Sequence, residues 1–152
     1  MRSNYYKEMG EMVYRNIPPR IMIEEFINDG SGAAPKDYKF FVFRGKIAMI
    51  QVDATRFTDH RRNLYTTDWE WIDVLYSRKG IDEPVERPAL LQKMLATAEA
   101  LGREFDFIRV DLYATGDRVY FGELTATPEG GLARFTQKEY DRYLGDMWRV
   151  EA

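Results

Sequence analysis

Apolar and polar positions form their clearest pattern in the first third of the chain. Residues 38–43 and 47–52 are rich in aromatic and β-branched side chains, and residues 44–46, with a central glycine, separate them. Two β-prone runs joined in this way predict a β-hairpin. An earlier β-prone run, residues 20–27, follows two prolines that resist helix formation. This part of the chain therefore predicts strands of a sheet.

A helix is predicted over residues 88–101, after a long segment without periodicity. Pro88 suits the first turn of a helix, and Gly102 is expected to end it. The apolar positions that recur at helical spacing are Leu91, Leu95, Ala98 and Leu101. Residues 53–87 are rich in charges instead, and they predict an irregular segment that is either a functional loop or a structure that the pattern does not reveal.

Two strands and a second helix complete the pattern. Residues 107–113 and 118–125 are β-prone and are separated by a turn, and residues 137–148 form an amphipathic segment with helical spacing. Strands, a loop, a helix, a hairpin and a final helix thus follow one another. This order predicts the α+β class with a mostly antiparallel sheet.

Composition narrows the classes of function. The 152 residues suit one domain, and the net charge of −3 offers no basic excess, so we expect no nucleic-acid partner. The sequence contains neither a signal-peptide core nor 18 consecutive apolar residues, so we expect a cytoplasmic protein without a membrane span. With no cysteine and one histidine, a metal site must rely on oxygen ligands, which favours Mg²⁺, Mn²⁺ or Ca²⁺.

Two acidic residues in the second predicted hairpin are the candidates for metal binding. Asp111 shares a strand face with Arg109, opposite the apolar positions of the same strand. Glu123 lies in an apolar and aromatic run, where a carboxylate is costly unless it is paired, hydrogen-bonded or metal-bound. A two-residue turn would place the two acids on opposite faces, whereas an odd-length loop or a β-bulge would place them side by side. A divalent cation between them would then relieve their repulsion.

The spacing alone leaves an alternative open. Asp111 could pair with Arg109 or Arg118 on a solvated face of the sheet, and Glu123 could pair with another arginine. Under the metal interpretation, both carboxylates lie within reach of one cation. Replacing either of them with alanine is then expected to leave the fold intact, because the two carboxylates repel each other.

Two further features also admit two interpretations. Arg56, Arg61 and Arg62 crowd together and could bind phosphate or carboxylate groups, or they could form a solvated charged run. Lys39 could face a phosphate or an acyl substrate, or it could be a solvated lysine at the edge of a sheet.

Several motifs together resemble those of the ATP-grasp superfamily. Residues 109–128 resemble its closing metal motif, in which an Arg-x-Asp strand, a turn and a strand ending in Glu-x-Asn precede a small-Pro-Gly loop. Residues 23–27 resemble its hinge strand. Within the superfamily the chain is most similar to the TupA-like group of teichuronopeptide biosynthesis, on the tracts Asn4-Tyr5-Tyr6, Pro19-Arg20-Ile21, Asp37-Tyr38-Lys39-Phe40 and Gly122-Glu123-Leu124-Thr125. The resemblance covers nearly the whole chain and implies the C-terminal lobe of the ATP-grasp fold.

This resemblance implies a site for ATP and Mg²⁺ on the second hairpin. Asp111 would bind one Mg²⁺ and Glu123 would bridge two. Thr125 would be a further metal ligand, at a position where the superfamily usually has asparagine. Arg109 would be the catalytic residue that neutralises the γ-phosphate and an acyl-phosphate-like transition state, through its planar and permanently charged guanidinium.

The resemblance also implies which residues bind the nucleotide. Glu24 and Glu25 would lie near the adenine and ribose, and the backbone around Phe26 and Ile27 would read the edge of the adenine. Lys39 would face the phosphates or the acyl substrate.

The implied activity is that of an ATP- and Mg²⁺-dependent carboxylate–amine ligase of bacterial surface polysaccharide or glycopeptide biosynthesis, with small-molecule carboxylate and amine substrates. Residues 1–20 do not resemble the substrate domain or the lysine-bearing flap that precede the hinge strand in complete ATP-grasp enzymes. We therefore expect residues 1–152 to form one partial domain that needs a complementary N-terminal half or forms a homodimer. The alternative is a non-catalytic nucleotide-binding, metal-binding or interaction module that retains the fold.

Overall fold

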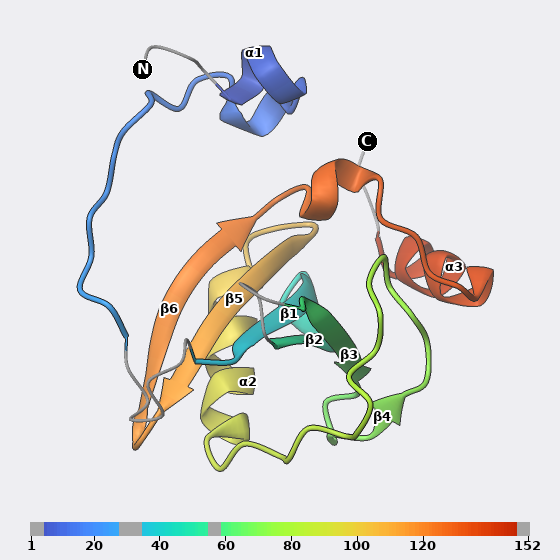
Figure 1. The fold of residues 1–152 in the computed structure, drawn as a ribbon. Helices are drawn as coiled ribbons and strands as arrows, with labels where there is room; N and C mark the ends of the chain where they lie inside the picture. Colours follow the sequence, from blue (N-terminus) through green and yellow to red (C-terminus); the bar gives the residue numbers. More distant parts are fainter. Residues whose placement is uncertain (1–4, 28–34, 55–58, 149–152) are drawn as a thin grey trace.

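The computed structural model describes residues 5–27, 35–54 and 59–148. Six strands form one antiparallel sheet in the order β4-β3-β2-β1-β5-β6 (Figure 1). In chain order the elements are α1 (Tyr5–Met9), η1 (Met12–Tyr14), β1 (Asp37–Phe43), β2 (Lys46–Ala54), β3 (Arg61–Tyr65), β4 (Trp71–Ile72), α2 (Leu91–Gly102), β5 (Ile108–Thr115), β6 (Arg118–Thr125), η2 (Pro128–Gly131) and α3 (Lys138–Met147). The predicted α+β class with a mostly antiparallel sheet is confirmed.

Both predicted hairpins are present, and each has a two-residue turn. Strands β1 and β2 are joined through Arg44 and Gly45, whose φ angles are 48° and 77°. Two consecutive positive φ values characterise the type I′ turn, which matches the twist of the strands that it connects. The predicted final helix corresponds to α3. Because β1 pairs with β2 on one side and β5 on the other, Lys39 lies inside the sheet and not at an edge.

Helix α2 covers one face of the sheet and forms the main core with it (Figure 1). Its buried residues are Leu91, Met94, Ala98 and Gly102, whereas Leu101 is 37% exposed. The sequence predicts Gly102 to be the capping residue just after the helix. This prediction is wrong, because Gly102 is the last helical residue of α2. An added Cβ at Gly102 would lie 2.4 Å from Cγ1 of Val42, so the glycine permits close packing of α2 on β1.

The opposite face is apolar in one half only, where α3 covers it. There Phe41, Phe43, Met49 and Leu64 of the sheet form a second core with Val74, Tyr76 and Phe135. Tyr140, Leu144 and Met147 of α3 pack against this group. The other half of this face carries polar side chains, which belong to the site described below. None of the helices in the described ranges has the length and apolar composition needed to cross a membrane.

The segment from 53 to 87 is more ordered than its pattern predicts. Strand β2 runs on to Ala54, and β3 and β4 extend the sheet on that side. The pattern hides β3 because it begins with two arginines and an asparagine; of these, Arg62 and Asn63 are buried with polar partners. Trp69 is a packing residue, since its ring stacks on Tyr65 with 4.4 Å between centroids. Arg56 lies outside the described residues.

The strand predicted at residues 20–27, which contains the hinge-like residues 23–27, is absent, because residues 17–27 run without regular structure (Figure 1). Their apolar side chains are exposed: Ile21 to 90%, Met22 to 80% and Ile23 to 94%. A β-prone run forms a strand only when a second strand pairs with its backbone groups. No strand of the described sheet pairs with this segment.

Candidate functional site

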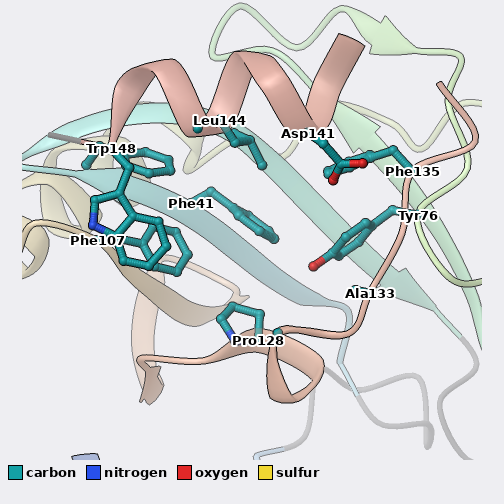
Figure 2. Close-up of a pocket in the computed structure, with 12 residues that line it drawn as sticks. Phe41, Tyr76, Phe107, Pro128, Ala133, Phe135, Asp141, Leu144 and Trp148 are labelled. Atoms are coloured by element: carbon teal, nitrogen blue, oxygen red, sulfur yellow. The ribbon is translucent and has the colours of Figure 1, made fainter. Parts of the chain in front are cut away.

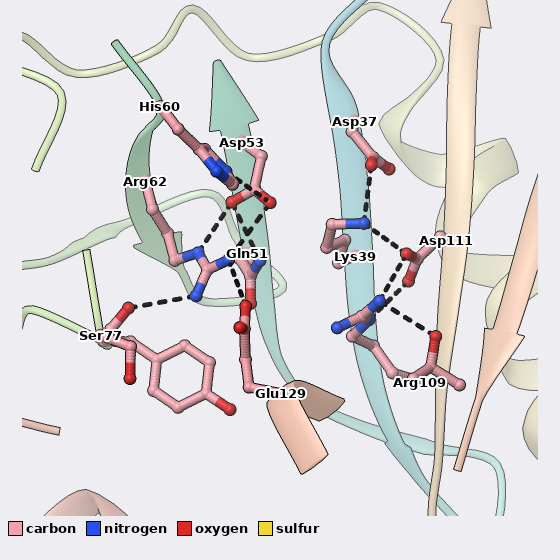
Figure 3. A network of polar contacts seen from close by, with 12 residues as sticks. Asp37, Lys39, Gln51, Asp53, His60, Arg62, Ser77, Arg109, Asp111 and Glu129 are labelled. Carbon is pink, nitrogen blue, oxygen red and sulfur yellow. Dashed lines mark hydrogen bonds and ion pairs between the residues drawn. The ribbon is translucent and has the colours of Figure 1, made fainter. Parts of the chain in front are cut away.

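A row of buried charged and polar side chains crosses four strands on the face opposite α2 (Figure 3). Lys39 of β1 is paired in register with Gln51 of β2 and with Asp111 of β5. We call the following residues the charged row; each is exposed to 6% or less: Asp37, Lys39, Gln51, Asp53, Arg62, Arg109 and Asp111. Buried charges are costly unless they are paired, so the arrangement of partners decides what this row can do.

A β-bulge in β6 brings Glu123 to the end of the charged row. The turn at Gly116 and Asp117 has two residues, and the pairing runs regularly from Thr115 with Arg118 to Leu112 with Phe121. The register then shifts by one residue, so that Asp111 is paired with Glu123 and Gly122 is the extra residue of the bulge. Of the alternatives left open by the sequence, the bulge is the one found. An added Cβ at Gly122 would lie 3.0 Å from the carbonyl oxygen of Asp111, so a glycine suits this close approach.

Asp111 is held between two basic side chains. Its carboxylate accepts a hydrogen bond from Nζ of Lys39 and two from Arg109, from Nε at 2.7 Å and from Nη2 at 2.8 Å. Lys39 also pairs with Asp37 at 2.6 Å. Lys39 is therefore a buried, doubly paired residue, and the solvated alternative is wrong. Removing Asp111 would leave buried positive charge unpaired, so the expectation of an intact fold now applies to Glu123 alone, whose side chain is 61% exposed.

Three oxygen atoms converge on one nitrogen of Arg109. Nη2 donates to Oδ2 of Asp111 at 2.8 Å and to Oε1 of Glu123 and Oγ1 of Thr125 at 3.0 Å each. The hydroxyl of Thr125 donates in turn to Oε1 of Glu123 at 3.1 Å. The other terminal nitrogen, Nη1, makes no hydrogen bond within the described ranges. Its N–H groups are therefore available to a ligand.

A second cluster of charges lies beside the first, on β2 and β3 (Figure 3). Arg62 donates to Asp53 through Nε at 2.8 Å and to Glu129 through Nη2 at 2.9 Å. Glu129 has a φ of 51°, an uncommon value for a residue other than glycine, and this turn of η2 presents its carboxylate to Arg62. Nε2 of His60 lies 3.1 Å from Oδ2 of Asp53. Arg62 is thus buried and paired, so it is not part of a solvated run.

The pKa values of the acids in these clusters diverge. Burial raises the pKa of Asp111 above its ordinary value, against the opposing effect of Arg109 and Lys39. Burial would also raise the pKa of Glu123, but Asp111, Thr125 and Arg109 hold it below its ordinary value. Likewise Arg62 outweighs the effect of burial and lowers the pKa of Asp53. Adjacent carboxyl groups with divergent pKa values are typical of functional sites.

The oxygen atoms around Arg109 fit Mg²⁺ as a donor set. Carboxylate and hydroxyl oxygens are the hard ligands that this ion prefers. Acidic side chains outnumber basic ones in the two clusters, which favours a cation; the acids are Asp37, Asp53, Asp111, Glu123 and Glu129, and the bases are Lys39, Arg62 and Arg109. No group of three or more acidic or histidine side chains with metal-binding geometry occurs among the described residues, so water and phosphate would complete the shell.

The residues predicted to bind the nucleotide lie apart from the charged row. Glu24, Glu25, Phe26 and Ile27 line a groove of about 510 Å³ together with Thr115, Tyr120 and Phe121 at the turn end of the second hairpin. The structure therefore brings these four residues together with one another and with β5 and β6. It does not bring them to Lys39, Arg109 or Asp111, which lie further along the strands.

Sequence analysis missed four polar members of the two clusters: Asp37, Gln51, Asp53 and Glu129. One signal was present for two of them, because Gln51 and Asp53 alternate with the apolar residues Ile50 and Val52 in β2. Glu129 gave no such signal, since its place depends on the turn that brings η2 to β3.

Fold and site together define a class of protein. An antiparallel sheet with helices on both faces, and a hairpin that sets an Arg-x-Asp strand against a Glu-x-Thr strand, agree with a lobe of the ATP-grasp fold. The family model described as TupA-like ATPgrasp matches residues 1–149. The chain therefore belongs to the TupA-like ATPgrasp family and has its ligase-type fold. A search of curated proteins and a search of solved structures each gave no match.

Proposed function

We propose that this chain is the catalytic lobe of an ATP- and Mg²⁺-dependent carboxylate–amine ligase. The observation that carries the proposal is the convergence of Asp111, Glu123 and Thr125 on Arg109 at the bulge of the second hairpin. Membership in an ATP-grasp family supports ATP as the phosphate donor. The TupA-like grouping supports a role in bacterial surface polysaccharide or glycopeptide assembly.

In such a reaction, a carboxylate oxygen attacks the γ-phosphorus of ATP, ADP leaves, and an acyl phosphate forms. The nitrogen of an amine then attacks the acyl carbon, phosphate leaves, and the nitrogen gives up a proton as the amide forms. Negative charge develops on the phosphoryl oxygens in the first step, so a fixed positive group beside them stabilises its transition state.

Arg109 is the residue that we propose for this role. Asp111 holds its guanidinium through two hydrogen bonds, which fixes the plane of the group. Nη1 remains available, as described above, and can donate to a phosphate oxygen without any loss of these bonds. Lys39 has three N–H donors, and Asp37 and Asp111 take two of them, so the third can also face a phosphate.

Asp111, Glu123 and Thr125 are the proposed ligands of Mg²⁺. The bound ion would neutralise phosphate charge and orient the γ-phosphate. The groove formed by Glu24, Glu25, Phe26 and Ile27 is the proposed site for adenine and ribose. It lies at the Thr115 end of β5, six residues from Arg109, or about 20 Å along the strand.

The proposal is tested by calorimetry with a non-hydrolysable ATP analogue, in the presence and absence of Mg²⁺. Glu123→Ala should remove the Mg²⁺-dependent part of the binding, and the affinity should fall at least about tenfold, or about 1.4 kcal/mol. Asp117→Ala is the matched control, because Asp117 is an exposed acid of the same hairpin whose side chain is 96% exposed. If Glu123→Ala and the parent protein show the same dependence on Mg²⁺, the proposed metal site is wrong.

A non-catalytic module that binds Mg²⁺-nucleotide is the second candidate. One observation favours it: Lys39, Arg62 and Arg109 are each already paired with carboxylates, which weakens their hold on phosphate. Release of ADP from ATP separates the two candidates, measured on the chain alone and with a complementary N-terminal half. Sedimentation of the same samples tests the predicted homodimer. Binding of Mg²⁺-nucleotide without turnover in either sample would support the module.

A further inference from the structure

A cavity of about 250 Å³ lies between the sheet and α3, beside the charged row (Figure 2). Six of its twelve lining residues are aromatic, and Asp141 and the hydroxyl of Tyr76 add polar groups. The residues that matter here are Phe41, Tyr76, Phe107, Phe135, Asp141 and Trp148. An aromatic cavity with a few convergent polar groups is the usual form of a site for a small organic ligand.

The hydroxyl of Tyr76 points into this cavity (Figure 2). The side chain is held by its ring, which stacks on Phe135 with 4.5 Å between centroids and lies 5.3 Å from Cζ of Arg62. Tyr76 is exposed to 6% only, yet its hydroxyl has no hydrogen-bond partner within residues 5–27, 35–54 and 59–148. The hydroxyl opens into the cavity, so its donor and acceptor sites are available to a ligand.

Asp141 of α3 supplies the second polar group, and its carboxylate lies on the same side of the cavity as Tyr76 (Figure 2). Burial raises the pKa of Tyr76; the charge of Arg62 opposes this rise and that of Glu129 adds to it, with smaller effects from Arg109 and Asp141. The hydroxyl is therefore protonated at neutral pH and can donate a hydrogen bond to a ligand. Arg62, whose Cζ lies 5.3 Å from the ring centroid of Tyr76, belongs to the charged row, so this end of the cavity adjoins that row.

The register of the sheet also places the cavity next to the site. Phe41, on its floor, is paired with Arg109 across β1 and β5. The groove at Thr115 lies at the opposite end of β5. Along the strands the order is thus the groove, the oxygen atoms around Arg109, and the cavity. A group bound in the cavity would therefore lie on the far side of Arg109 from a nucleotide in the groove.

We propose that the cavity binds the amine substrate, and that this substrate is a small primary amine with an apolar body. This inference rests on the proposed ligase function. The aromatic walls would hold the body, and Asp141 and the hydroxyl of Tyr76 would bind the nitrogen. A carboxylate ligand would be repelled by Asp141. Because a water occupies about 30 Å³ of liquid, the cavity accommodates a body of about eight waters in volume.

Three probes of similar shape test the proposal by calorimetry without nucleotide: 2-phenylethylamine, 2-phenylethanol and 3-phenylpropanoate. We expect the amine to bind at least about tenfold more tightly than the other two. Asp141→Asn should remove most of this preference, and Tyr76→Phe should reduce amine binding severalfold. Asp146→Asn is the matched control, because it removes the same charge from the same helix and Asp146 does not line the cavity. Perturbation of the Trp148 indole N–H signal in NMR would place the probe in the cavity.

Three results would each overturn the proposal. They are equal binding of the three probes, an equal loss of amine preference in Asp141→Asn and Asp146→Asn, and no binding of the amine at millimolar concentration. Circular dichroism of every variant verifies that it is folded. Glu123→Ala separates this inference from the proposed function, since it should lose Mg²⁺-dependent nucleotide binding and keep amine binding. If the parent protein binds Mg²⁺-nucleotide and not the amine, this inference fails and the proposed function stands.

Discussion

The face of the sheet that packs on α2 and the face opposite it are built from alternate residues of the same strands. Against α2, Phe40, Val110 and Leu112 are fully buried among other apolar side chains. On the opposite face, Lys39 and Asp111 are buried almost as deeply, but they are charged. Burial is therefore similar on the two faces, and the chemistry of what is buried differs.

This difference separates stability from function. Full burial of a large apolar side chain contributes about 1.5–3 kcal/mol, so the α2 face stabilises the fold. A buried ion costs several kcal/mol unless its partners are well placed, and even a well-paired ion adds little net stability. The core on α2 thus offsets the cost of the charged row, to which the proposed function assigns the chemistry. Four predictions test this division.

The largest effect is expected on the charged face. Asp111→Ala leaves Lys39 and Arg109 buried without this carboxylate, and breaking a buried pair in this way costs about 3–5 kcal/mol. Urea denaturation measures the free energy of unfolding. The exposed Asp117→Ala control should change it by less than about 0.5 kcal/mol. A similarly small loss for Asp111→Ala would show that the charged row is not held together by this residue.

At alkaline pH, we expect the face of the sheet that packs on α2 to lose stability first, through Tyr38. Burial raises the pKa of Tyr38 from 10.0 to about 12, so the folded state keeps the proton longer than the unfolded state. The contribution of Tyr38 is complete below pH 10 and is lost as the pH rises to about 12, by up to about 3 kcal/mol. Tyr38→Phe removes this term. The free energy of unfolding, measured from pH 9 to pH 12, should therefore fall less steeply for the variant than for the parent protein. Equal slopes would contradict the raised pKa of Tyr38.

Two helical glycines provide a matched comparison of the faces. Gly102→Ala brings a methyl group against Val42 and should destabilise the protein by about 1–3 kcal/mol. Gly145→Ala in α3 meets open space, so the higher helix propensity of alanine should stabilise the protein by about 0.5–1 kcal/mol. Thermal unfolding of both variants measures the difference. Effects of equal sign would mean that α2 and α3 pack on the sheet with similar tightness.

The smallest predicted effect is a change in how strongly acidic pH destabilises the fold. Arg62 lowers the pKa of Asp53, so this acid stabilises the fold above pH 3.8, its ordinary value, and the contribution disappears as the pH falls through the lower folded value. Asp53→Asn should therefore lose less stability on acidification than the parent protein does. Denaturation in urea at pH 3 and pH 6 tests the difference. An equal loss of stability from pH 6 to pH 3 in the variant and the parent protein would show that the pairing of Arg62 with Asp53 does not contribute to the acid sensitivity.

Much of the fold could be predicted from local pattern. Alternation in residues 108–112 predicts that the apolar residues Ile108, Val110 and Leu112 face the core, and this is the arrangement found. The pattern failed for β3, because Arg62 is a charged residue that becomes buried only through its partners Asp53 of β2 and Glu129 of η2. It also failed for residues 20–27, since their β-prone composition provides no partner strand.

The sequence by itself determined the class of fold, the two faces of β5, and the acids Asp111 and Glu123 as candidates. It could do so because the direction of a side chain from a strand follows from its position in an alternating run. Only the tertiary structure decided that the bulge at Gly122 brings these acids together, that Lys39 is buried, and that a cavity lies beside Arg109. Each of these facts depends on contacts between segments far apart in the chain, and local periodicity carries no information about such contacts.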